Sequence, residues 1–327
     1  MLQYVFQVTK YDPEDRDERG HYVGTEDIVS DQGPVEAAYL AAVAEFAADT
    51  GVERLIIREP ETAAFANFGL EPPVPGNGLA GLFPDGMAGY HDGAEVTTEV
   101  GLELVRAMLR DNGAWCRLEV EDRFLVHVGY DQYVYVGSDR PCERALTRTQ
   151  DLGLFSERLE QSPYDIVIED ENENERRPAD SVFWDQVTEL VATGRAGLLE
   201  ERPVRNASRW HRLAEGDVDQ IRERLAPRAI VAVWPGISSD RQTVLASLPD
   251  DYLVRLVWED QDGQIHSLIT DDARSETLPT ARAVMALSCI ADEQPPLLAA
   301  VLPDTDGVLR ARWGSERDQE HLRAGHS

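Results

Sequence analysis

Basic and aromatic residues alternate with apolar ones between Trp115 and Gly137, in the stretch WCRLEVEDRFLVHVGYDQYVYVG. Successive side chains of a β-strand point to opposite faces, so this alternation predicts three short strands that present one set of residues outward. The residues of that set that could stack on or contact RNA bases are Arg117, His127, Tyr133 and Tyr135. Glu119 and Glu121 would share the face and repel phosphate, and cross-strand packing of the rings is the alternative use of the same pattern.

The most cationic local segment is SRWHRL, residues 208–213. Its candidate contact residues are Arg209, Trp210 and Arg212. Basic side chains next to an aromatic ring are typical of surfaces that bind single-stranded nucleic acid. The alternative is a helix whose tryptophan packs inward while its arginines form ion pairs with surface carboxylates. The segment therefore predicts either a second RNA-binding surface or a structural element.

The segment DRDERGHYVGTE, residues 15–26, has part of the spacing of a calcium-binding loop. Asp15, Asp17, Gly20 and Glu26 fall at the first, third, sixth and twelfth positions of such a loop. Arg19 occupies the fifth position, where it cannot ligate a cation, and a strand precedes the segment instead of a helix. A solvated turn that hydrogen-bonds to itself is the alternative to a metal site.

Two histidines lie in the longest polar and glycine-rich segments of the first half of the chain. His21 and His91, the second beside Asp92, could form a metal site or an acid–base pair. No HExxH or CxxC spacing accompanies them, and Cys116 falls in an alternating strand where a buried apolar role is expected. The glycine-rich nucleotide-binding motifs and the GxSxG hydrolase motif are absent, so we expect no cofactor.

The charge of the chain is its strongest compositional feature. Its 327 residues include 61 Asp and Glu against 31 Lys and Arg, a net charge of -30. A chain this acidic repels nucleic acid at long range unless basic residues gather locally, and it attracts basic partners. No apolar run is long enough for a membrane span, no export signal is recognised, and the three widely spaced cysteines favour a reducing cytoplasm.

The first half of the chain predicts an α+β domain over residues 1–165. YVFQVTK and LIIRE are predicted strands, and the alanine-rich segment after Pro34 is a predicted helix that ends at Gly51. The segments GLELVRAMLRD and CERALTRTQDLG are further predicted helices. A pattern of helix, Asp-x-Gly and strand occurs twice, which suits a sheet with helices on one face. Residues 66–94 are predicted to form a long ordered loop or lid.

The second half predicts another α+β domain. Residues 166–180 are an expected acidic linker, residues 181–315 the second domain and residues 316–327 a polar tail. VFWDQVTELVATG and VDQIRERLAP are predicted helices, and the segments that follow are predicted strands, among them LSCIAD and VLRARW. Asp262-Gly263 and Asp306-Gly307 predict tight hairpins. Each domain is therefore expected to be a mostly antiparallel sheet packed with helices.

Several longer phrases of the chain resemble a known family. These phrases are QVTKYDPEDRDERGHYVG, SDQGPVEAAYLAAV, LVRAMLRDNGAWCRLEVEDRF and HVGYDQYVYVGSDRPCERA, with a weaker match from RNASRWHRL to VLRARW. They resemble an actinobacterial family of acidic proteins commonly labelled "RNA-binding protein". The resemblance implies RNA as a ligand and brings no catalytic residues.

Three functions follow from these observations as hypotheses. The first is a non-enzymatic, cytoplasmic RNA-binding or RNA-associated accessory protein. The second is an acidic protein-interaction module, of the immunity, antitoxin or nucleic-acid-mimic type, that binds a basic partner. The third is a metal-dependent enzyme with its site in the long loops of the first domain.

Overall fold

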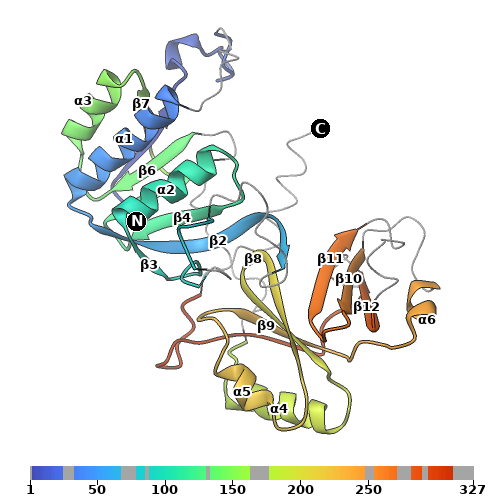
Figure 1. Cartoon of the computed structure of the whole chain (residues 1–327). Coiled ribbons are helices and arrows are strands. Elements are labelled where there is room, and N and C mark those ends of the chain that lie inside the picture. Colours follow the sequence, from blue (N-terminus) through green and yellow to red (C-terminus); the bar gives the residue numbers. More distant parts are fainter. Residues whose placement is uncertain are drawn as a thin grey trace. The chain divides into compact units, whose positions relative to one another are not determined.

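The structure is a computed structural model, shown in Figure 1. It describes residues 2–24, 33–67, 79–84, 88–129, 133–162, 177–246, 254–270, 281–288 and 294–311. The chain divides into two compact units of the α+β class, one made of residues 1–63, 73–169 and 312–327, the other of residues 64–72 and 170–311. In the parts of the chain that are described, no helix is both long and apolar enough to cross a membrane.

The first unit is built on an antiparallel sheet in which β3 pairs with β2 and the order continues β2-β4-β5-β6-β1-β7. Its strands are β1 (Tyr4–Thr9), β2 (Arg54–Asn67), β3 (Glu95–Thr97), β4 (Trp115–Val120), β5 (Phe124–Val128), β6 (Val134–Ser138) and β7 (Phe155–Leu159). Its helices are the short 3-10 helix η1 (Pro13–Asp15), α1 (Pro34–Thr50), α2 (Thr98–Leu109) and α3 (Glu143–Asp151). The strands and helices expected in this half of the chain are confirmed, and β2 is longer than expected.

The helices α1, α2 and α3 lie on one face of this sheet, as Figure 1 shows. Phe6 of β1 meets Phe46 of α1 with ring centroids 5.6 Å apart. A Cβ on Gly101 of α2 would lie 2.5 Å from Leu55 Cδ1, so the missing side chain lets α2 approach the sheet. Because strand side chains alternate, the residues next to Phe6 and Leu55 along their strands point to the opposite face.

The ends of α1 follow from local chemistry. Pro34 occupies its first turn, where a missing backbone N–H costs nothing. Gly51 ends it in the left-handed conformation with φ of 65°. Arg123 then donates from Nη2 to the Thr50 carbonyl at 2.7 Å, which satisfies a carbonyl at the negative end of the helix.

The second unit contains two sheets. Its elements are α4 (Ser181–Ala192), β8 (Leu198–Arg212), α5 (Val218–Arg222), β9 (Ile230–Trp234), α6 (Arg241–Ala246), β10 (Val254–Glu259), β11 (Ile265–Thr270), β12 (Ala283–Ser288) and β13 (Leu298–Val301). One sheet has β9 between β8 and β13, and the other has the order β11-β10-β12. The pairings of β9 with its neighbours and of β10 with its neighbours are antiparallel, as expected.

Strand β8 folds back on itself, which Figure 1 shows as a bent ribbon. Leu213 N donates to Gly197 O at 2.9 Å, and Asn206 at the bend has φ of 63°. Alternation then sends Leu199 into the core formed with α4 and α5, while Trp210 joins the core formed with β10, β11 and β12. This hairpin is thus covered on both faces.

Several expectations for the second half differ from the structure. The segment SRWHRL, whose structural alternative was a helix, belongs to strand β8. The end of the expected linker is folded, since Pro178 bridges to Val301 and Ala179 is buried. The expected strand LSCIAD begins earlier, as β12, and the described start of VLRARW, residues 308–311, is not a strand. The alternation of apolar residues predicted that strands exist better than it predicted where each strand begins and ends. The ends depend on which neighbouring strand pairs with it.

Candidate functional site

The expected RNA-contacting residues of the first unit do lie on one face of the sheet, away from α1 and α2. His127 pairs in register with Tyr135, and Tyr135 pairs with Gln7. Arg117 of β4 pairs with Arg58 of β2. This polar row, made of Arg58, Arg117, His127, Tyr135 and Gln7, crosses the sheet from β2 to β1.

The polar row is buried, contrary to the exposed face that alternation predicted. Tyr135 is 4% exposed and Gln7 is 9% exposed. The side chain of Arg117 is 15% exposed. His127 is half-buried as a residue, but both of its ring nitrogens are buried. A base cannot stack on Tyr135 or His127 unless the face is first uncovered.

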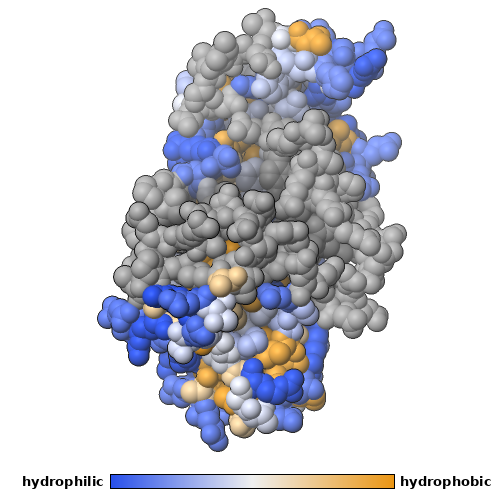
Figure 2. Space-filling view, turned by 90° about the vertical axis from the view of Figure 1, so that its right-hand side faces the viewer, coloured by the Kyte–Doolittle hydropathy of each residue, from blue (hydrophilic) through white to orange (hydrophobic). Residues whose placement is uncertain are grey.

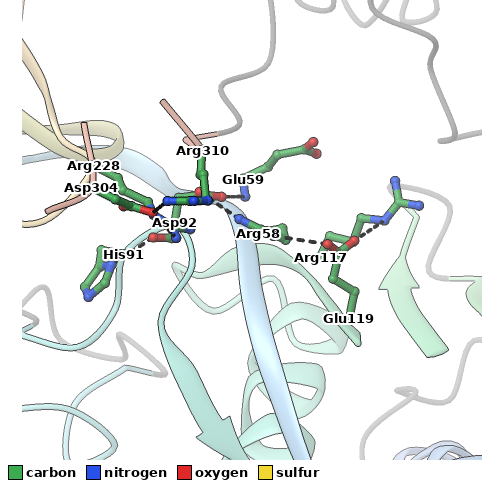
Figure 3. A network of polar contacts seen from close by, with 9 residues as sticks. All are labelled: Arg58, Glu59, His91, Asp92, Arg117, Glu119, Arg228, Asp304 and Arg310. Carbon is green, nitrogen blue, oxygen red and sulfur yellow. Dashed lines mark hydrogen bonds and ion pairs between the residues drawn. The ribbon is translucent and has the colours of Figure 1, made fainter. Parts of the chain in front are cut away.

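Charges at the β2 end of the polar row balance each other, as Figure 3 shows. Arg58 donates from Nε to Glu119 at 3.1 Å and from Nη1 to Asp92 at 3.2 Å. Arg117 Nε lies 3.8 Å from the same Glu119. Asp92, whose side chain is fully buried, also accepts from the Glu59 amide at 3.1 Å. Two guanidinium groups thus face two carboxylates, which is how buried charges are tolerated.

The histidine of the row is held neutral. Burial, reinforced by the positive charge of Arg117, lowers the pKa of His127 to about 3. A ring with this pKa carries no charge at neutral pH and cannot attract phosphate. His127 therefore acts as a packed polar residue of the sheet under those conditions.

Tyr133 directly precedes β6 and lies on the same face of the sheet as the polar row, but its surroundings differ. Its ring meets the ring of Tyr11 edge-on with centroids 6.0 Å apart, and Tyr11 meets Tyr22 at 4.6 Å. All three tyrosines are half-buried. Lys10 Nζ lies 5.1 Å from the centroid of the Tyr11 ring. We call Tyr11, Tyr22 and Tyr133 the tyrosine cluster; the sequence pattern pointed to Tyr133 alone, because the other two come from a loop.

The loop that contributes Tyr22 is closed by its own hydrogen bonds. Arg16 and Tyr22 form an antiparallel bridge, and Asp17 Oδ1 accepts from the amides of Arg19 at 2.8 Å and His21 at 2.9 Å. The backbone hydrogen bond from His21 lowers the pKa of Asp17. Arg16 reaches Glu157 of β7 at 2.8 Å, which fixes the loop to the sheet.

Among the expected metal ligands that the structure describes, Asp15, Asp17, His21 and His91 form no group that could hold a metal ion. Asp17 serves the self-bonded turn, which was the alternative to a calcium loop, and Glu26 lies outside the described residues. His91 Nδ1 is 2.9 Å from the Asp92 carbonyl oxygen, while the Asp92 carboxylate pairs with Arg58. Within the described ranges, no group of three or more His, Cys, Asp or Glu side chains could hold a metal ion. Burial also raises the pKa of Cys116 to about 12, so its thiol stays protonated.

The expected cationic surface of the second unit is neutralised by carboxylates. Arg209 lies 3.4 Å from Glu201, and Arg212 lies 2.6 Å from Glu259. Trp210 is 8% exposed and donates from Nε1 to Ser267 Oγ at 3.0 Å. An inward tryptophan with paired arginines is what the structural alternative predicted, although these residues lie on a strand and not on a helix.

Two buried glutamates of β8, Glu200 and Glu201, were not predicted from the sequence. Glu200 accepts from Ser208 at 2.7 Å, Trp234 Nε1 at 3.0 Å and Arg255 at 2.6 Å. Glu201, on the opposite side of the strand, lies 2.7 Å from His211. Burial acts to raise the pKa of each glutamate, but nearby arginines and hydrogen bonds outweigh it, so the pKa of each is lowered. Adjacent glutamates within an apolar strand were the signal that could have revealed them.

A second ion-pair cluster lies near the end of the described chain, and Figure 3 draws Arg228, Asp304 and Arg310 of this cluster. Arg228 forms a bidentate pair with Asp304 at 2.7 and 2.9 Å. Arg310 reaches both Asp304 and Asp306. The pKa of Asp306 is lowered to about 2, chiefly by its hydrogen bond with Arg310. Here again arginines are neutralised by nearby carboxylates.

Comparison with protein-family models, with curated proteins and with solved structures finds no match to this chain.

Proposed function

We propose that this protein is a non-enzymatic binding protein whose acidic surface binds a basic protein partner. The observation that carries the proposal is the local pairing of its arginines. The arginines expected to contact RNA are Arg117, Arg209 and Arg212. They form ion pairs with Glu119, Glu201 and Glu259, respectively. Each of these charges is balanced by a carboxylate of the same unit, while the chain as a whole carries a net charge of -30.

The surface supports a mainly electrostatic contact. Figure 2 shows hydrophilic residues over much of the coloured part of one face, with hydrophobic residues in small groups. Among the described residues, the large hydrophobic side chains that are exposed are Val23, Val182, Leu268 and Val308. Charged surfaces of opposite sign accelerate association and select partners, and they act without a large apolar patch.

RNA, which the family resemblance implied, is the competing ligand. Phosphate is bound by Lys and Arg that release counterions, and the candidate arginines are already paired with carboxylates. Base stacking needs exposed rings; Tyr135 and Trp210 are buried, and Tyr133 is half-buried. The described geometry thus favours a cationic protein over a nucleic acid.

A binding role also fits the state of the buried titratable groups. Asp92, Glu200 and Glu201 are each paired with an arginine, and the pKa of both glutamates is lowered. His127 is neutral, and the Cys116 thiol is protonated at neutral pH. These groups support the sheets rather than a reacting centre.

The test is a pair of titrations of the full chain at increasing salt. One uses a labelled arginine–glycine peptide, with an aspartate–glycine peptide of equal length as control, and the other uses a mixed total-RNA pool. We expect saturable binding of the cationic peptide that weakens with salt, and no binding of the control or of RNA. RNA binding without peptide binding would replace this proposal with the RNA-binding function.

A further inference from the structure

The tyrosine cluster is an aromatic surface built from two separate parts of the chain. Tyr11 follows β1, and Tyr133 precedes β6, so the sheet itself brings these two rings together. Tyr22 is placed on Tyr11 by the turn that Asp17 closes. Each residue keeps part of its surface exposed. The cluster is therefore less buried than Tyr135 and Gln7 of the polar row beside it.

The electrostatics of the tyrosine cluster favour a cation. The face of an aromatic ring carries partial negative charge, and Tyr11 already has a cation, Lys10 Nζ, 5.1 Å from its centroid. Burial together with the charges of Asp15 and Asp12 raises the pKa of Tyr22. Asp12 directly follows Tyr11 in the chain.

The approach of one carboxylate to the cluster depends on Gly24. A Cβ at this position would lie 2.8 Å from Asp15 Oδ2 and would also overlap the Tyr22 hydroxyl. The carboxylate and the hydroxyl therefore both sit over the bare α-carbon of Gly24. Aromatic faces and acidic oxygens thus converge on one small area of the first unit.

We propose that Tyr11, Tyr22 and Tyr133, with Asp12 and Asp15 beside them, form a docking site for an arginine side chain of a basic protein partner. This inference rests on the proposed function and names the place where the partner is held. A guanidinium group fits the chemistry because its plane stacks on tyrosine rings while its N–H groups donate to carboxylates. An ammonium group would gain the charge attraction but not the stacking.

The first experiment measures binding of the arginine–glycine peptide to variants of the full chain by fluorescence anisotropy. Tyr11→Leu with Tyr22→Leu keeps apolar volume and removes the rings, and Asp12→Asn with Asp15→Asn removes two charges. We expect each pair to weaken binding about tenfold, from the loss of about two cation–π or charge-assisted contacts. The matched control is Glu215→Gln with Glu223→Gln, which removes two exposed charges from the second unit and should change binding less than twofold.

Lys10 provides a variant that separates the two ligand classes by the sign of its effect. Lys10→Met removes the internal cation from the Tyr11 ring, so we expect the arginine peptide to bind several-fold more tightly. If the cluster stacks RNA bases instead, the same substitution removes a phosphate contact and weakens RNA binding. This variant leaves the three rings in place, so it remains informative if the tyrosine variants fail to fold.

The outcomes distinguish failure of the docking site from failure of the proposed function. If the peptide binds the unaltered chain and all cluster variants bind it equally, the docking site is wrong while the proposed function stands. If the cationic peptide does not bind the unaltered chain at low salt, both proposals fail. If the tyrosine and Lys10 variants lose RNA binding, the cluster is an RNA-stacking surface and the docking site for arginine is overturned.

Discussion

Individual residues of the polar row combine burial with charge, and this makes them sensitive to substitution. Asp92 is fully buried, and its carboxylate accepts hydrogen bonds from Arg58 and from the Glu59 amide. A buried ion pair contributes little net stability, yet removal of one partner leaves the other charge buried and unpaired.

We therefore predict that Asp92→Ala lowers the free energy of unfolding by about 3–5 kcal/mol. The matched control is Glu95→Ala, which removes the carboxylate of the exposed Arg54–Glu95 pair and should cost about 0–1 kcal/mol. Urea unfolding followed by circular dichroism measures both. Equal losses for the two variants would contradict the burial of the Asp92 pair.

His127 makes a prediction about pH. Its pKa is about 3 in the folded protein against 6.5 for a free histidine, so the unfolded chain binds more protons between these values. The free energy of unfolding then falls as pH decreases below about 6.5, by about 1.4 kcal/mol per pH unit from this group. We predict that His127→Gln loses less stability than the unaltered protein between about pH 7 and pH 5, by about 2 kcal/mol in urea unfolding. Parallel pH profiles would show that His127 is not buried as a neutral ring.

At the scale of elements, the second unit depends on a close approach of two backbones. Gly197 precedes the β8 hairpin, and Gly236 follows β9; the Gly197 amide donates to the Trp234 carbonyl at 3.0 Å. A Cβ on Gly197 would lie 2.5 Å from the Gly236 Cα, whereas a Cβ on Gly236 would lie 4.0 Å from the Gly197 Cα.

This asymmetry predicts different outcomes for the same substitution at two neighbouring sites. Gly197→Ala should lower the free energy of unfolding by about 1–3 kcal/mol, because backbone must move to admit the methyl group. Gly236→Ala should be accepted with a change of about 0.5 kcal/mol or less. Chemical unfolding of both variants checks this, and a similar cost at the two sites would mean that the contact between the backbones is not tight.

The whole molecule is governed by its excess of negative charge. A net charge of -30 produces repulsion within the folded state that salt screens, while its surface ion pairs are weakened by salt to a smaller extent. Between about 10 mM and 150 mM salt the Debye length falls from about 30 Å to about 8 Å.

We predict that sodium chloride raises the melting temperature over this range by several degrees, since about 1 kcal/mol corresponds to about 2–4 °C for domains of about 150–250 residues. Differential scanning calorimetry at neutral pH measures the shift. The control is the same series at the acidic pH where the net charge vanishes, and there the shift should disappear. A melting temperature that falls with salt at neutral pH would show that ion pairs outweigh the repulsion.

The sequence by itself determined the helices and strands expected in the first half of the chain, and the charge. Pro34 and Gly51 mark the ends of α1 because their backbone preferences act locally. The alternation between Trp115 and Gly137 correctly assigned residues to strands and to faces, since side-chain direction in a strand depends only on its period of two. Tyr133 was singled out on the same basis.

Only the tertiary structure decided which of these residues a ligand can reach. Period and composition assign Tyr135 and Trp210 to a face, but whether that face is covered depends on segments distant in sequence. The same holds for the pairing of Arg58 with Asp92 and for the contact of Tyr11 with Tyr133, which join residues far apart in the chain. Burial and ion pairing are properties of long-range packing, and no local pattern encodes them.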